Sequence, residues 1–313
     1  MDRRLSRSTL GLIVLGMVVA ALVAFAIRTP SPPDETDQTA NAPLAGTPTA
    51  PTGSVSPNPT TENPPASPPA ELASETVLLS VVDDETAAVR GLSGDCETGG
   101  AVLESSDDGG ATWDALEVPA RGLLRVKAVS DREMWVVGTD EVCNARFIRS
   151  TNGGRTWSTN TGTDGAWHLL PSGAAEVHAP ESNVDSPCED GTAAVDLAAT
   201  NSGRAAVLCQ GGRVHTTRNS GETWLRAGAV DDATALAFRG ASTGFAAAPG
   251  DATCDGTRVS RSTDNGLTWD ERGCVEGAAD GVAMAFSSKT VGLLATVDET
   301  WRTDDAGRTW TRL

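Results

Sequence analysis

The stretch Arg149-Ser-Thr-Asn-Gly-Gly-Arg-Thr-Trp157 has the composition of a surface turn, yet it ends in tryptophan. Asn152, Gly153 and Gly154 are residue types that favour tight turns, because they tolerate a positive φ or bond to nearby backbone groups. A tryptophan has a large apolar surface that is more useful inside a protein than in water. We therefore predict that this turn leads directly into the core.

Nearly the same phrase occurs five times, with the pattern Ser/Thr-x-Asp/Asn-x-Gly-x-Thr-Trp, which we call the box. The spacings between successive box tryptophans are 44, 67, 45 and 41 residues. A repeat of this length indicates a propeller or a solenoid. The shared positions are Ser106, Asp108, Gly110, Thr112 and Trp113; Ser150, Asn152, Gly154, Thr156 and Trp157; Thr217, Asn219, Gly221, Thr223 and Trp224; Ser262, Asp264, Gly266, Thr268 and Trp269; and Thr303, Asp305, Gly307, Thr309 and Trp310.

Upstream of each box lie two short apolar runs separated by a polar turn, as in Leu123–Gly138 and Gly281–Val297. Runs of five to eight residues between turn residues indicate β-strands. Each unit then has strands a, b, c and d in chain order, with the box between c and d. The predicted fold is all-β, a β-propeller of four-stranded antiparallel blades that stack to bury both faces of each sheet.

The box resembles the Asp-box, or BNR repeat, of sialidase-type propellers, which is also found in sortilin-type receptors and in photosystem II assembly-factor-like propellers. The resemblance covers residues 71–313 and implies the same propeller fold, in a membrane-anchored bacterial version. A scaffold role of the box agrees with its chemistry. Asn152 or Asp accepts backbone N–H groups, the hydroxyls tie the two arms, and Trp157 packs inward as the first residue of strand d.

The box is accordingly expected to be structural, with no catalytic residue in it. Asp107-Asp-Gly-Gly lacks the series of oxygen ligands that a calcium loop requires. The three histidines and six cysteines show no zinc-binding spacing, so neither a metal nor another cofactor is expected.

All six cysteines map to the face of the propeller opposite the boxes, in b–c or d–a loops or at strand ends. In an exported domain they predict three disulfides, among fifteen pairings that the sequence leaves open. Proximity favours Cys188–Cys209 and Cys254–Cys274 within one blade each, and Cys96–Cys143 between neighbouring blades.

The 67-residue spacing indicates an insertion at residues 158–190 on the same face. Long loops on a rigid scaffold often bind partners, so Trp167, His168, His178 and Asp185 are candidate binding residues. The alternative is that Trp167 and the histidines only pack the insertion down. We expect five boxed blades plus this insertion, with a sixth blade hidden in the insertion as the second alternative.

The N-terminal part carries a membrane signal. Residues 1–9 are basic, and 10–27 form an apolar run without charges, long enough to span a bilayer. We expect a signal anchor, with a cleaved signal peptide as the alternative. Residues 28–70 hold most of the prolines and predict a disordered stalk that precedes the domain 71–313. The domain is then extracytoplasmic at the cell membrane, or secreted if the signal is cleaved.

The sequence predicts a non-enzymatic binding or assembly module that acts through its loop-rich, cysteine-bearing face. The net charge of −18 disfavours nucleic acid and leaves a protein or a cell-envelope glycan as the partner. The alternative is a glycoside hydrolase similar to sialidases, which use a Tyr nucleophile, a Glu partner, an Asp acid/base and three Arg. The chain has no Tyr and lacks their Arg-Ile-Pro motif.

Overall fold

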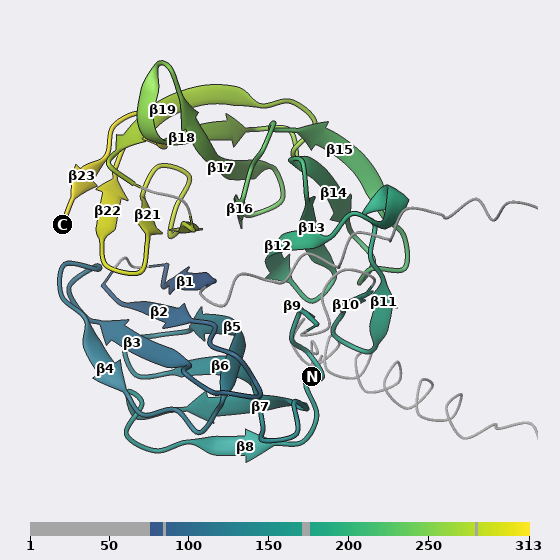
Figure 1. The fold of residues 1–313 in the computed structure, drawn as a ribbon, viewed down its shortest axis with the longest axis vertical. Helices are drawn as coiled ribbons and strands as arrows, with labels where there is room; N and C mark the ends of the chain where they lie inside the picture. Colours follow the sequence, from purple (N-terminus) through teal and green to yellow (C-terminus); the bar gives the residue numbers. More distant parts are fainter. Residues whose placement is uncertain (1–75, 84–85, 171–175, 279–280) are drawn as a thin grey trace, which may run out of the picture. The chain divides into compact units, whose positions relative to one another are not determined.

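The computed structural model describes residues 76–83, 86–170, 176–278 and 281–313, all within one compact unit. These residues form six antiparallel sheets arranged around a common centre, a six-bladed β-propeller (Figure 1). Five sheets have four strands and one has three. The all-β propeller predicted from the box repeat is therefore confirmed.

Each blade consists of consecutive strands in the order in which they leave the centre. The blades are, in order, β1 (Val77–Val81), β2 (Ala88–Leu92), β3 (Val102–Ser106) and β4 (Asp114–Leu116); β5 (Gly122–Ala128), β6 (Met134–Thr139), β7 (Ala145–Ser150) and β8 (Ser158–Asn160); β9 (His168–Leu169), β10 (Glu176–His178) and β11 (Asn183–Asp185); β12 (Ala194–Asn201), β13 (Arg204–Cys209), β14 (Arg213–Thr217) and β15 (Leu225–Ala229); β16 (Ala235–Arg239), β17 (Thr243–Asp251), β18 (Cys254–Ser262) and β19 (Asp270–Glu276); and β20 (Ala283–Phe286), β21 (Gly292–Ala295), β22 (Thr300–Thr303) and β23 (Thr311–Arg312).

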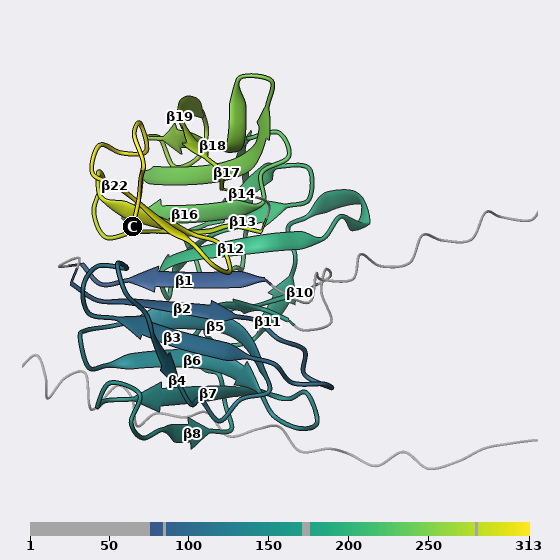
Figure 2. The same cartoon turned by 60° about the vertical axis from the view of Figure 1, so that its left-hand side comes forward.

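The innermost strand of each blade contacts those of its two neighbours, so that the ring closes between β20 and β1. Figure 2 shows β1 lying along β2 as the innermost strand of the first blade. Blade 1 and blade 6 are each built from one continuous segment, so neither blade combines strands from both ends of the domain. Contacts between side chains therefore close the ring.

The third blade lies in the segment that we expected to be a loop insertion. The segment contributes β8 to blade 2 and then β9, β10 and β11, with a 3-10 helix, Glu189–Gly191, in place of a fourth strand. Of the two alternatives, six blades is therefore the correct one. The strands of blade 3 have two or three residues and no box, which is why their pattern is weak in the sequence.

The hydrophobic core lies in the joints between blades. Blades 5 and 6 share the largest cluster, in which the rings of Phe245 and Phe286 stack at 3.5 Å between centroids. Similar clusters join blades 1 and 2, 3 and 4, 4 and 5, and 6 and 1. Among the described residues, no such cluster joins blades 2 and 3. Packing of sheet against sheet around the ring thus supplies most of the apolar burial.

The box forms the turn between strands c and d. In blade 2 the hydroxyl of Ser150 accepts the N–H of Gly154 at 2.9 Å, and Oδ1 of Asn152 accepts the N–H of Thr156 at 3.0 Å. Gly154 has a φ of 77°, which other residues rarely adopt. The other four boxes repeat these two hydrogen bonds, at 2.8–3.1 Å.

The aspartates of two boxes show how strongly the turn favours the ionised carboxylate. The hydroxyl groups of Thr112 and Thr268 donate to Asp108 and Asp264, and these hydrogen bonds lower the pKa of each carboxyl to about 2. Each aspartate is thus an acceptor committed to its own turn.

Each box also joins its blade to the preceding blade. A Cβ added to Gly154 would meet Leu116 of blade 1 at 2.7 Å, and the indole N–H of Trp157 donates to the backbone oxygen of Glu117 at 2.7 Å. The other box glycines face the preceding blade in the same way, against Leu293 (from Gly110), Val184 (from Gly221), Ala227 (from Gly266) and Val259 (from Gly307). Strand d begins one residue after the tryptophan, so the indole belongs to the joint more than to the strand.

The predicted signal anchor at 10–27 and the stalk at 28–70 lie outside the described residues. Within the described ranges, no helix is long and apolar enough to span a membrane.

Candidate functional site

Three disulfides hold the face of the propeller opposite the boxes. They join Cys96 to Cys143, Cys188 to Cys209, and Cys254 to Cys274, with Cα atoms 5.4–5.6 Å apart. These are the pairs that proximity favours. Cys254 begins β18 and Cys274 lies within β19, slightly inside the positions expected for them. The first disulfide links loops of blades 1 and 2, and the other two fasten the chain within or beside one blade.

This cysteine-bearing face consists of the b–c and d–a loops and the strand ends beside them. Its surface is rich in carboxylates that form no ion pair within the described ranges: Glu141, Asp164, Glu181, Asp231, Asp232, Asp255, Glu276 and Asp298. All of them are exposed. Like charges gathered on one side of a molecule create a negative potential that attracts cationic partners.

The arginines of the same face are already engaged. Arg146 pairs with Asp140 at 2.6 Å, and Arg213 pairs with Glu189 at 2.8 Å. Arg258 and Arg312 likewise pair with Asp251 and Glu299, and Arg121 donates to the backbone oxygen of Glu97 at 2.5 Å. Within the described ranges, the negative charge of the face is therefore not balanced by unpaired arginines.

The candidate binding residues of the 158–190 segment have different surroundings. Trp167 and His168 are almost completely buried, at 2% and 1% exposure. The indole N–H of Trp167 donates to the backbone oxygens of Asn201 and Ser202, and its ring meets Trp224 edge to face. Trp167 thus joins blade 3 to blade 4, as the packing alternative supposed.

In the described part of blade 3, the side chains accessible to a partner lie mainly in β11 and in the turn that precedes it. His178 is half-buried and bonds to Thr163 and Asn183, whereas Asp185 is exposed at the end of β11. Burial and the neighbouring His178 lower the pKa of His168 to about 3, so this ring is neutral.

Charged side chains also line the centre of the ring, where the inner strands face one another. Asp196 of β12 accepts the N–H groups of Leu236 at 2.6 Å and of Leu197 at 2.7 Å. Arg125 of β5 donates to the backbone oxygen of Trp167 at 3.1 Å. Burial raises the pKa of Asp196 to about 6 and lowers the pKa of Arg125 to about 10.

A second charged group lies near the a–b turns, at the box end of the same ring. Arg239 of blade 5 pairs with Asp83 of blade 1 at 2.9 Å. Burial, together with the charges of Arg125 and Arg239, lowers the pKa of Lys127. Arg125 and Arg239 are thus each engaged with the protein itself, Arg125 with the backbone of Trp167 and Arg239 with Asp83.

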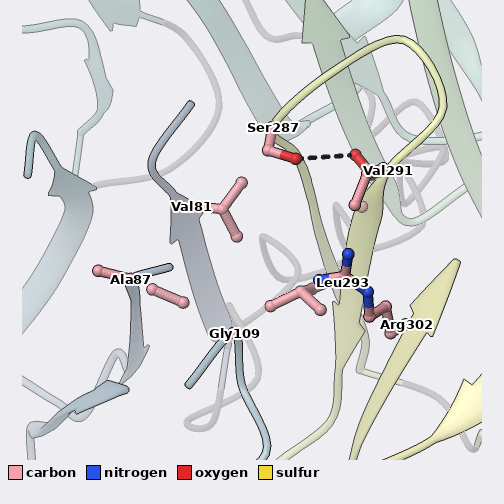
Figure 3. A pocket seen from close by; sticks show the side chains of 9 residues that line it. Val81, Ala87, Gly109, Ser287, Val291, Leu293 and Arg302 are labelled. Atoms are coloured by element: carbon pink, nitrogen blue, oxygen red, sulfur yellow. Dashed lines mark hydrogen bonds between the residues drawn. The ribbon is translucent and has the colours of Figure 1, made fainter. Parts of the chain in front are cut away.

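The joint between blades 1 and 6 encloses a small apolar cavity of about 10 Å³ (Figure 3). In Figure 3, Val81 and Leu293 point toward one another across it, and the hydroxyl of Ser287 donates to the backbone oxygen of Val291. A space of this size holds about one water molecule. It is a packing defect at the joint, too small for a ligand.

Two features of this site are not evident from the sequence alone. The charges at the centre of the ring were overlooked because Arg125 and Asp196 sit within runs treated as apolar, although the polar positions Arg125 and Lys127 alternate with apolar ones. The acidic character of one face was visible only as net charge, because its carboxylates are scattered along the chain. In the described ranges, no group of His, Cys, Asp and Glu is arranged to hold a metal ion.

No protein-family model matches the chain, and no curated protein sequence is significantly similar to it. Among solved structures, the chain is similar to YCF48 bound to D1 peptide, with 18% identity over 76% of this chain and 81% of that chain and a TM-score of 0.41. It is also similar to YCF48 from Cyanidioschyzon merolae, with 17% identity over 77% and 85% of the two chains and a TM-score of 0.43. The fucose-specific lectin from Aleuria aurantia is 11% identical over 79% of this chain and 96% of that chain, with a TM-score of 0.49. At these identities and TM-scores, no function is transferred from any of them.

Proposed function

We propose that this protein is an extracytoplasmic, membrane-tethered propeller that captures a protein partner without catalysis, through its cysteine-bearing face. The observation that carries the proposal is the set of unpaired carboxylates on a face whose loops three disulfides hold in place. Such a surface favours a partner with a basic patch, because complementary charge speeds encounter and excludes acidic competitors.

Rigid loops support a binding role on physical grounds. A loop that is already fixed loses less conformational entropy when a partner docks, so more of the contact energy appears as affinity. The disulfides also suit an oxidising compartment outside the cytoplasm. The apolar run at 10–27 supports a membrane tether, and an anionic envelope glycan is disfavoured by the charge of the face.

The proposal is tested by capture of envelope proteins on the immobilised full-length chain. One variant neutralises the face with Glu181→Gln, Asp231→Asn and Asp232→Asn, three exposed carboxylates without ion pairs. The matched control removes three exposed carboxylates of the box face, with Asp107→Asn, Asp131→Asn and Glu222→Gln, and has the same net charge. We expect the first variant to lose the captured protein and the control to keep it.

Salt should weaken capture by the wild type, because screening shortens the range of exposed charges. Equal capture by both variants would contradict the proposal. Capture of an envelope polysaccharide and of no protein would show that the partner is a glycan. The enzymatic alternative is checked separately with a fluorogenic sialoside. No turnover is expected, since the chain has no tyrosine to act as nucleophile.

A further inference from the structure

Three arginines meet at the joint between blades 5 and 6, on the box side of the propeller. Arg261 is at the box end of β18, Arg272 lies in β19, and Arg308 belongs to the box of blade 6. A Cβ added to Gly273 would lie 2.5 Å from the backbone oxygen of Arg308, which shows how closely β19 approaches that box. Residues far apart in the sequence thus bring three positive charges together.

No carboxylate neutralises this group. None of the three forms an ion pair within the described ranges, and Asp270, the cross-strand neighbour of Arg261, is exposed and unpaired. Burial and the charges of Arg272 and Arg308 lower the pKa of Arg261. The positive charge is therefore uncompensated at one place in a strongly acidic protein.

The arginines are also held in place and partly dehydrated. The guanidinium of Arg261 lies 5.8 Å from the ring centre of Phe245, a cation–π contact. A β-bulge opposite Val259 and Ser260 displaces Arg272 from the regular ladder, and bulges commonly redirect a side chain. The Nε atoms of Arg261 and Arg272 are buried without a hydrogen-bond partner. A guanidinium group that lacks water on one side forms a more stabilising hydrogen bond to an anion than a fully hydrated guanidinium does.

We propose that Arg261, Arg272 and Arg308 form a binding site for a tetrahedral oxyanion, a phosphate or sulfate group that is either free or an ester on a larger molecule. Guanidinium groups bind such oxygens through paired, charge-assisted hydrogen bonds, which makes arginine the usual residue for this task. The site lies on the opposite side from the acidic face and is independent of the partner binding proposed above.

The test measures binding of inorganic phosphate, inorganic sulfate and glucose 6-phosphate to the full-length protein in detergent, by calorimetry at constant ionic strength with chloride as reference. Arg308→Gln and Arg272→Gln are each expected to raise Kd about tenfold or more, the effect of losing one charge-assisted hydrogen bond. Arg155→Gln is the matched control, because Arg155 holds the same box position in blade 2 without two arginine neighbours.

Tighter binding of glucose 6-phosphate than of inorganic phosphate would indicate an esterified ligand, and the reverse order a free ion. Absence of saturable binding to the wild type would overturn the proposal. So would equal Kd values for Arg308→Gln and Arg155→Gln, since a nonspecific anion effect is common to both. Arg308 is exposed, so its variant keeps the test valid even if Arg272→Gln folds poorly.

Discussion

Replacing Ser150 by alanine removes the hydroxyl at the centre of the box of blade 2. The side chain is 1% exposed and accepts the buried N–H of Gly154 at 2.9 Å. Without it, that N–H has neither a protein partner nor water, and a buried unpaired donor costs about 1–3 kcal/mol. Only one oxygen atom is lost, so the cavity term is small. We expect the free energy of unfolding to fall by about 2 kcal/mol.

In a domain of this size, 1 kcal/mol shifts the melting temperature by about 2–4 °C, so Ser150→Ala should melt about 4–8 °C below the wild type. Thermal unfolding followed by circular dichroism measures this shift. The control is Ser158→Ala in the same blade, an exposed residue whose hydroxyl donates to the backbone oxygen of Arg149. The free energy of unfolding of this control should differ from that of the wild type by no more than about 0.5 kcal/mol.

Ser150→Thr should restore stability, because Thr217 and Thr303 perform the same task in two other boxes. The bracing role assigned to the box would be refuted if Ser150→Ala melted at the temperature of Ser158→Ala.

Three further outcomes follow from the disulfides, the buried histidine and the acidic face. Replacing Cys188 and Cys209 together by serine should lower stability by about 3 kcal/mol in the chain-entropy model, since the disulfide closes a separation of 21 residues; denaturant titration measures the loss, and free thiols in the native protein would contradict the pairing. His168 has its pKa lowered from 6.5 to about 3, so the stability due to its neutral form is complete above pH 6.5 and is lost as the pH falls from there toward 3. Between pH 7.5 and 5 the free energy of unfolding of the wild type should fall by about 2 kcal/mol more than that of His168→Gln. Protonation of Asp196 stabilises the fold over the same range, but equally in both proteins. Parallel profiles of stability against pH would argue against a buried neutral ring. Capture of the envelope partner should fall with rising salt for the wild type and for the box-face control alike, and salt-independent capture would remove charge from the explanation.

The sequence was sufficient for the architecture because the box is a local signal that repeats. Five copies at nearly constant spacing predict blades, and the hydrogen-bonding capacity of Ser150 and Asn152 predicts the turn. Proximity along the chain also indicated the disulfides, since Cys188 and Cys254 each lie about one hairpin from their partners. Blade 3 escaped prediction because its strands are too short for an alternating pattern.

The functional surfaces were harder to predict, because they are assembled from distant positions. Arg261 and Arg308 are neighbours only once blades 5 and 6 pack together. The role of Trp167 was undecided for a similar reason. A tryptophan in a long segment is compatible with ligand binding, and only its burial beside Trp224 shows that it joins two blades.

No apolar cluster joins blades 2 and 3 in the described part of the chain, so we expect the ring to open transiently at this joint first. A closed ring of blades can open only by parting one joint, and parting costs least where the least apolar surface is buried. Here that joint is bridged by polar contacts, such as the one from Arg125 to the backbone of Trp167. Arg125 and His168, whose charged forms are poorly solvated in the closed ring, lie at the same place. We therefore expect the ring to open at this joint, away from the chain ends, more often as the pH falls, because water entering there would solvate protonated His168.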